Sequence, residues 1–489
     1  MQTHSGSLKK SIKQQMYYAT GIVTTKIIAI IMLPVFTHFL SPTDYARLDI
    51  IQTLANLMCI IVAFGLADSL FRFAGESNDP VVRQHMAATT FALALVSLVI
   101  GTAITQLIAP LLSQILPGNI SLFQTRTILG SLSVTACILV PLAWLRMQDN
   151  AALFFLVTTG WTASQAGMTV LALSMGYGVD GILVSGLICS ILLAIILSIY
   201  QIKSTGICFS AERLTAQGRF GGMLVLAGIA TFIIDCSGRW MLVSEVGVLA
   251  LAEYALAWKV GIMALLFTEP FSMWWMPKRF EVLKEVSKAQ CASTTEIGIV
   301  IALISVVVIS SMGALTITLL SPLEYHGAIK YVPAFALIAG IKAITSLLTT
   351  GILSEKETLK PIYIDSAAAA VALICNLIFI PYFEVWGVIF ALMIALLLRL
   401  FCYFLIGQRV NYLPYHLPRM YLLFCLVIII IALISQADTP FVTLFIGACG
   451  GVILLLSAFI TGSIPTCMLY TLLKKLYAPL HRSLYIRRS

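Results

Sequence analysis

Charged residues are scarce in this chain. Asp, Glu, Lys and Arg make up 10% of its 489 residues and 60% are hydrophobic, whereas about a quarter of a soluble domain is charged. A soluble fold of this composition has too little polar surface to cover its core. The sequence therefore excludes an ordinary soluble protein and indicates a chain that lies mostly within a lipid bilayer.

Long polar stretches are also missing, so there is no separate soluble domain. Only helices and closed barrels satisfy their backbone in lipid, and a spanning helix needs roughly 20 apolar residues. The apolar runs have this length, about twice that of a barrel strand. We expect an all-α integral membrane protein with about fourteen transmembrane helices. The expected spans are 15–39, 46–72, 85–111, 123–146, 151–175, 181–202, 220–243, 250–276, 295–320, 331–353, 362–382, 386–408, 419–436 and 441–470.

Patterns that hold metals, form disulfides or bind nucleotides are absent. The 11 cysteines avoid the outer loops and include no C-x-x-C, and the 6 histidines are scattered without ligand spacing. No phosphate-binding loop occurs, so we do not expect the chain to hydrolyse ATP itself. The sequence predicts no metal, no cofactor and no enzyme activity.

Positive charge is unevenly distributed among the loops. Most of the 30 Lys and Arg fall in alternate predicted loops and the span ends beside them, and the other loops with their span ends hold only Arg47, Arg126 and Lys330. Because Lys and Arg concentrate in cytoplasmic loops, the asymmetry predicts that both termini are cytoplasmic. Topology thus explains the net charge of +9 without a nucleic-acid partner.

A short internal repeat points to two lobes. Asp44-Tyr45-Ala46 opens the second span, and Glu253-Tyr254-Ala255 stands near the start of the eighth. A separation of six spans keeps the orientation, so these segments would be parallel repeats. The predicted division is then 1–210 (spans 1–6), 211–409 (spans 7–12) and 410–489 (spans 13–14 with a basic cytoplasmic tail). Chance similarity at three positions is the alternative.

Isolated charges fall inside several spans. Lys26, Lys259 and Lys342 have no acid three or four residues away on their own helices. A charge at the bilayer centre costs about 2.5–3.5 kcal/mol or more, so each needs a partner on another helix, a wet cavity or an anionic ligand. Glu269 and Asp365 are candidate proton or cation sites, with a packing role as the alternative.

Two acid–arginine pairs have the spacing of a local ion pair. Asp68 and Arg72 in the second span, and Asp235 and Arg239 in the seventh, are each four residues apart. This spacing puts both side chains on one helix face. For Asp68 and Arg72 a structural role is favoured. For Asp235 and Arg239 a structural and a functional role fit the sequence equally well.

Three segments carry a resemblance to a known family. Residues 26–45 (KIIAIIMLPVFTHFLSPTDY), 64–76 (FGLADSLFRFAGE) and 235–259 (DCSGRWMLVSEVGVLALAEYALAWK) resemble bacterial polysaccharide exporters of the Wzx type. The likeness covers roughly residues 12–280, and its motifs are loose. The glycine usual before the tyrosine is missing at both repeat positions. Drug exporters of the MATE type and lipid II flippases, in the same MOP superfamily, share the general plan.

The resemblance implies two six-helix lobes around a central cavity, with two extra C-terminal helices. It implies a flippase that moves undecaprenyl-diphosphate-linked oligosaccharide across the bacterial inner membrane for O-antigen, lipopolysaccharide or another surface polysaccharide. A polysaccharide polymerase and chain-length proteins would be partners. By the same resemblance, Lys26, Arg239 and Lys259 would engage the diphosphate; Lys342 is a candidate from its position alone.

Two rival functions remain open. A cation-coupled multidrug exporter would favour acids in the cavity, where this chain offers mostly bases. A membrane polysaccharide polymerase would carry a large outer loop with catalytic polar residues, which the sequence lacks.

Overall fold

The structure is a computed structural model that describes residues 2–63, 65–75, 79–353, 359–437 and 439–462. Within these ranges every regular element is a helix. The last predicted span, 441–470, is described up to residue 462 only. The described part is therefore all-α, as the composition and the length of the apolar runs predict.

The chain packs into two compact units. Unit 1 consists of Met1–Ala255, Leu320–His326 and Asp365–Leu392, and unit 2 of Leu256–Leu319, Gly327–Ile364 and Met393–Ser489. The lobes expected from the internal repeat follow chain order and have other boundaries; they stay a prediction.

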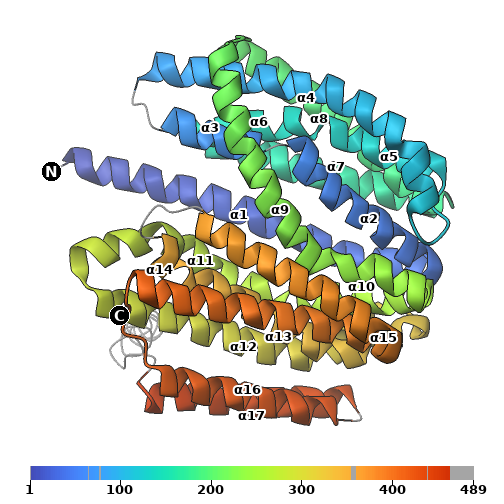
Figure 1. The fold of residues 1–489 in the computed structure, drawn as a ribbon, viewed down its shortest axis with the longest axis vertical. Helices are drawn as coiled ribbons and strands as arrows, with labels where there is room; N and C mark the ends of the chain where they lie inside the picture. Colours follow the sequence, from blue (N-terminus) through green and yellow to red (C-terminus); the bar gives the residue numbers. More distant parts are fainter. Residues whose placement is uncertain (1, 64, 76–78, 354–358, 438, 463–489) are drawn as a thin grey trace, which may run out of the picture. The chain divides into compact units, whose positions relative to one another are not determined.

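Unit 1 is built mainly from the first nine helices, drawn in blue to green (Figure 1). α7 packs against α1 and α8, and α2 packs against α5 and α9. Aliphatic and aromatic side chains from α3, α4, α6 and α8 form a continuous core that includes Leu70, Phe91 and Val140. The helices are α1 (Gln2–Phe39), α2 (Pro42–Ala63), α3 (Leu66–Gly75), α4 (Pro80–Ile115), α5 (Leu122–Ser133), α6 (Thr135–Met147), α7 (Ala151–Ser174), α8 (Gly178–Thr205) and α9 (Ala211–Glu245).

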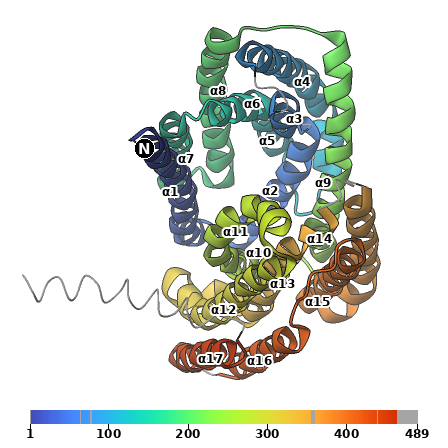
Figure 2. The same ribbon diagram turned by 90° about the vertical axis from the view of Figure 1, so that its left-hand side faces the viewer.

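Unit 2 contains α11 and α13, which pack against each other. It also contains the hairpin of α16 and α17, two helices that lie side by side in both views (Figures 1 and 2). Several elements contribute residues to both units: α10 (Val248–Gly261), α12 (Lys288–Leu320), the 3₁₀ helix η2 (Leu323–Tyr331) and α15 (Leu359–Val410). The others are α11 (Ala264–Glu281), the π-helix η1 (Val282–Val286), α13 (Val332–Leu348), α14 (Thr350–Leu353), α16 (Leu417–Ser435) and α17 (Pro440–Ile460).

The predicted membrane spans are confirmed. Among the described residues, 11 helices are long and apolar enough to cross a bilayer. α1 and α7 cover the first and fifth predicted spans. α15 covers two, because its backbone breaks at Glu384 between spans 362–382 and 386–408. The part of the chain that the structure describes thus accounts for fourteen spans.

Many large apolar side chains lie on the outside of the helices. Leu107, Ile115 and Ile460 are 79%, 68% and 86% exposed. Such a surface is unfavourable in water and is satisfied by lipid. The chain is a multi-pass membrane protein.

Candidate functional site: a buried charged centre

A buried ion pair joins two spanning helices of unit 1. Arg239 of α9 donates through Nη1 to both carboxylate oxygens of Asp49 on α2, at 2.9 and 2.7 Å. The two residues are only 7% and 1% exposed. Neither charge would be stable alone at this depth, because burial without a counter-ion costs several kcal/mol. The pair fixes α2 to α9.

Aromatic rings surround this pair. The guanidinium carbon of Arg239 lies 5.5 Å from the ring centre of Tyr254 on α10. Tyr45, one turn before Asp49 on α2, packs edge-on against Tyr325 with 5.7 Å between ring centres. The negative faces of such rings favour a nearby cation. Both tyrosines of the internal repeat are thus fully buried near the pair.

Close packing between α9 and α15 holds the arginine in place. A methyl group added to Gly238 would lie 2.4 Å from Val388 Cγ1, so only glycine allows this approach. Asn376 of α15 donates to the hydroxyl of Ser237 at 3.2 Å. Two contacts with α15, at Ser237 and Gly238 just before Arg239, therefore fix the rotation of α9 about its axis.

In unit 2, a lysine and a tryptophan form a second candidate centre. The Lys342 ammonium on α13 lies 5.2 Å from the ring centre of Trp258 on α10. Trp258 in turn packs edge-on against Phe335, with 5.5 Å between ring centres. Lys259 follows Trp258 directly and is half-buried, as is Lys342. Each of these two lysines also has a further interaction.

The remaining predicted residues lie on separate helices. Lys26 on α1 is exposed and has a partner in the structure. Asp235, one turn before Arg239 on α9, is half-buried, as is Glu269 on α11. Asp365 on α15 is buried.

Asp68 and Arg72 lie one turn apart on α3 and are exposed. The pairing of these two residues stays a prediction, as does that of Asp235 with Arg239. Among the described residues, no group of three or more His, Cys, Asp and Glu side chains is placed to hold a metal ion.

Two polar clusters at the ends of the unit 2 helices contain none of the residues that the sequence singles out. Arg279 of α11 is buried and donates to the hydroxyls of Thr349 and Thr350 at 2.9 and 3.4 Å. Burial lowers the pKa of this guanidinium from its usual value. Glu296 of α12 accepts from the backbone N–H of His416 at 2.7 Å.

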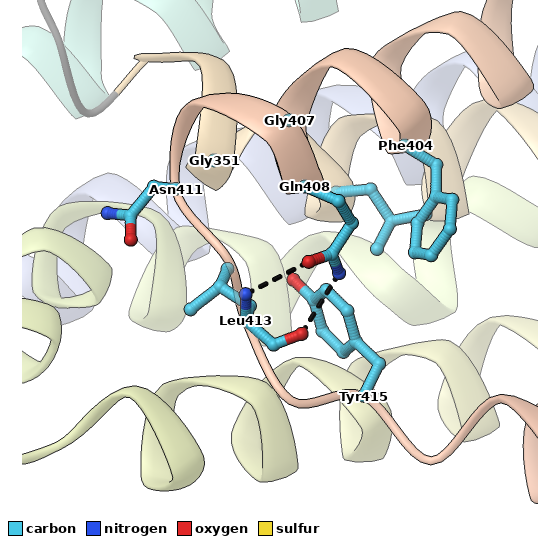
Figure 3. Close-up of a pocket in the computed structure, with 8 residues that line it drawn as sticks. Gly351, Phe404, Gly407, Gln408, Asn411, Leu413 and Tyr415 are labelled. Atoms are coloured by element: carbon cyan, nitrogen blue, oxygen red, sulfur yellow. Dashed lines mark hydrogen bonds between the residues drawn. The ribbon is translucent and has the colours of Figure 1, made fainter.

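A small cavity lies beside these clusters (Figure 3). Its volume is about 10 Å³, and Gly351, Gly407 and Tyr415 help to line it. The carboxamide of Gln408 closes one wall by bonding to both backbone groups of Leu413, at 2.9 and 3.0 Å. A cavity of this size holds about one water molecule. It is therefore a packing defect and not a transport site.

Comparison with known sequences gives one family. The profile of the family described as polysaccharide biosynthesis protein matches residues 11–282, more than half of the chain. No curated protein matches the chain significantly. The matched region runs from within α1 to the end of α11 and hence includes Asp49 and Arg239.

Solved structures of transporters share the fold. A lipid II flippase MurJ in an inward closed conformation has a TM-score of 0.73 at 13% identity, over 91% of this chain and 99% of that chain. An inward-facing multidrug resistance MATE family transporter of the MOP superfamily has a TM-score of 0.62 at 14% identity, over 80% and 95%. A MOP superfamily transporter from Pyrococcus furiosus has 0.56 at 16%, over 83% and 96%. Likeness at these identities shows the fold alone.

Proposed function

This chain belongs to the polysaccharide biosynthesis protein family, and from that premise we propose that it is a lipid-linked oligosaccharide flippase. Its cargo is an undecaprenyl-diphosphate-linked repeat unit, which it moves from the cytoplasmic to the periplasmic face of the bacterial inner membrane. The product feeds the assembly of a surface polysaccharide such as O-antigen. A polymerase and chain-length proteins act next on the product.

The charged centre of unit 1 is the observation that carries this proposal. Charged side chains within membrane spans are costly and mark the paths of polar cargo or ions. Arg239 and Asp49 are buried within spanning helices and tied to each other. A diphosphate that enters between these helices would find a guanidinium already held within the membrane spans.

The mechanism is alternating access between the lobes. Sugars and diphosphate do not cross hydrocarbon unaided, because no partner there replaces their hydrogen bonds to water. Lys26, Arg239, Lys259 and Lys342 bind the diphosphate while the lipid tail stays in the bilayer. Trp258 holds the Lys342 ammonium against its ring, with 5.2 Å from the ammonium to the ring centre. Arg239 becomes available when Asp49 releases it.

Energy for the cycle comes from the membrane potential or from an ion gradient. Each elementary charge moved is worth about 2.3 kcal/mol per 100 mV. Asp235, Glu269 and Asp365 are the acids proposed for ion coupling.

Lysine substitutions test the proposal in cells. Lys26→Ala, Lys259→Ala and Lys342→Ala are each introduced into a strain that lacks the chromosomal gene, and the surface glycan is measured. We expect at least one variant to lose the glycan and to trap lipid-linked units on the cytoplasmic face. Lys284→Ala is the matched control, because Lys284 lies exposed in η1.

Membrane levels of every variant are measured by immunoblotting. If all three lysine variants are present at normal levels and restore the glycan, the diphosphate site is wrong. If single units accumulate at the cell surface instead of inside, the protein is a polymerase and not a flippase.

A drug exporter is the second candidate, because the fold is also that of multidrug resistance transporters. Buried acids such as Asp49 would suit cationic drugs. Vesicles containing the protein would then export a cationic dye, and Asp235→Asn or Glu269→Gln would abolish export. Absence of dye export by the unmodified protein rules this candidate out.

A further inference from the structure

A groove on unit 1 is lined by none of the residues of the charged centre and has no role in the proposed transport. Its volume is about 480 Å³. It lies between the end of α7 and the start of α8, next to the start of α5. This volume is enough space for a stretch of hydrocarbon chain.

Two helical stripes form the walls of the groove. They repeat every three or four residues, so each lies on one helix face. The stripe on α7 is Met168, Leu171, Ala172 and Met175, and that on α8 is Gly181, Val184, Ser185 and Ile188. Phe123 of α5 and Tyr177 of the turn complete the lining. Two hydroxyls belong to the lining, those of Ser185 and Tyr177, and the Ser185 hydroxyl is already bonded to the backbone oxygen of Gly181 at 2.6 Å. The walls therefore suit hydrocarbon and give water little to bond.

One charged residue lines the groove. Asp180 stands in the first turn of α8 and accepts from Gln124 Nε2 at 2.8 Å. The side-chain oxygen of Gln124 accepts from the backbone N–H of Ser121, as part of the capping box of α5. The cap of α5 therefore orients the carboxylate of Asp180 on α8. Within the described residues, no cation forms an ion pair with Asp180.

An acid in the first turn also complements the positive end of the helix dipole. That role does not require the acid to line an apolar groove. The combination of a hydrocarbon-lined groove with a carboxylate in its lining fits a lipid with an apolar tail and a cationic head.

We propose that this groove binds phosphatidylethanolamine, with one acyl chain between α7 and α8 and the ammonium on Asp180. The negative charge of Asp180 opposes an anionic lipid, including a polyprenyl diphosphate, in the same place. The assignment is independent of the proposed transport function, because it uses none of the cavity lysines and holds for any cargo.

Native mass spectrometry of the purified full chain tests the assignment. The protein is titrated separately with phosphatidylethanolamine, phosphatidylglycerol of the same acyl chains, and undecaprenyl phosphate. We expect phosphatidylethanolamine to bind about three- to tenfold more tightly than phosphatidylglycerol, as befits one partly exposed ion pair.

Three variants locate the site. Asp180→Asn keeps an oxygen that accepts from Gln124 but removes the charge, so the preference should fall to near one. Val184→Trp fills the groove and should weaken binding of both phospholipids. Ile195→Trp adds the same ring to an exposed position of α8 outside the groove, and should change neither.

Equal binding of the two phospholipids to the unmodified protein overturns the proposal, as does an unchanged preference in Asp180→Asn. Preferential binding of undecaprenyl phosphate, lost in Val184→Trp, would make the groove a polyprenyl tail site instead. Should Val184→Trp fail to fold, the head-group preference of Asp180→Asn still decides.

Discussion

At the scale of single residues, the pair of Asp49 and Arg239 gives the sharpest test of what holds unit 1 together. Arg239→Leu leaves the Asp49 carboxylate buried without its cation. We expect a loss of about 3–5 kcal/mol in unfolding free energy, the usual cost of breaking a buried ion pair from one side. Thermal unfolding of the purified protein in detergent measures the change.

The double variant Asp49→Leu/Arg239→Leu separates charge from packing. Replacing both partners by apolar residues is often neutral, so most of the lost stability should return. Arg126→Leu is the matched control, since Arg126 is exposed on α5 and its loss should change stability by no more than about 0.5 kcal/mol. A double variant as unstable as Arg239→Leu would show that packing, and not charge, sets the loss.

The sequence could not reveal this pair. Asp49 and Arg239 are 190 residues apart, and only the packing of α2 against α9 brings them together. The closeness of Asp235 and Arg239 is predictable from the sequence, because both residues lie four positions apart on one helix. Asp49 does stand out in the sequence as an acid inside an apolar run, one turn after Tyr45. A single sequence, however, does not indicate which residue on another helix pairs with it.

At the scale of elements, the backbone strain at the break in α15 predicts how a substitution there changes stability. Glu384 has φ 51° and ψ −122°, a conformation that favours glycine because a Cβ is crowded there. Glu384→Gly should raise stability by about 1 kcal/mol through release of this strain. The same unfolding assay measures it.

Glu384→Ala is the control, because it removes the carboxylate but keeps the Cβ. It should leave the strain in place and gain little. Equal stabilisation by alanine and glycine would assign the effect to the charge instead of the backbone.

A second prediction at this scale concerns the hydrogen bonds by which Arg279 joins α11 to the end of α13 and the start of α14. Its guanidinium bonds two hydroxyls at the joint between α13 and α14. Arg279→Met keeps much of the apolar stem but removes both bonds, which should cost about 1.5–3 kcal/mol. Lys278→Met, at the exposed neighbouring position, should cost little. A similar loss in both variants would contradict the assigned role of Arg279.

Spans were predictable from the sequence, whereas their internal breaks were not. Length and hydropathy decide which segments enter lipid, so the boundaries at 382 and 386 agree with the break at Glu384. The joint between α13 and α14 falls inside an apolar run, and it depends on Arg279 from another helix. Periodicity within a single segment carries no information about such a contact.

At the scale of the whole molecule, charge asymmetry predicts orientation. α8 has 28 residues, or about 42 Å at 1.5 Å per residue, and a hydrocarbon core is about 30 Å thick. Its two ends must therefore lie on opposite sides of the membrane. Lys203 stands at the end that the positive charges assign to the cytoplasm, and Ser174 precedes the other end.

Cysteine labelling checks this orientation. Ser174→Cys and Lys203→Cys, both at exposed positions, are each made in a chain whose native cysteines are replaced by serine. A membrane-impermeant maleimide should label Ser174→Cys in intact spheroplasts, and Lys203→Cys only after lysis. The reverse pattern would invert every loop assignment, because one spanning helix fixes the sidedness of all its neighbours. The direction of the proposed transport would then have to be reversed with it.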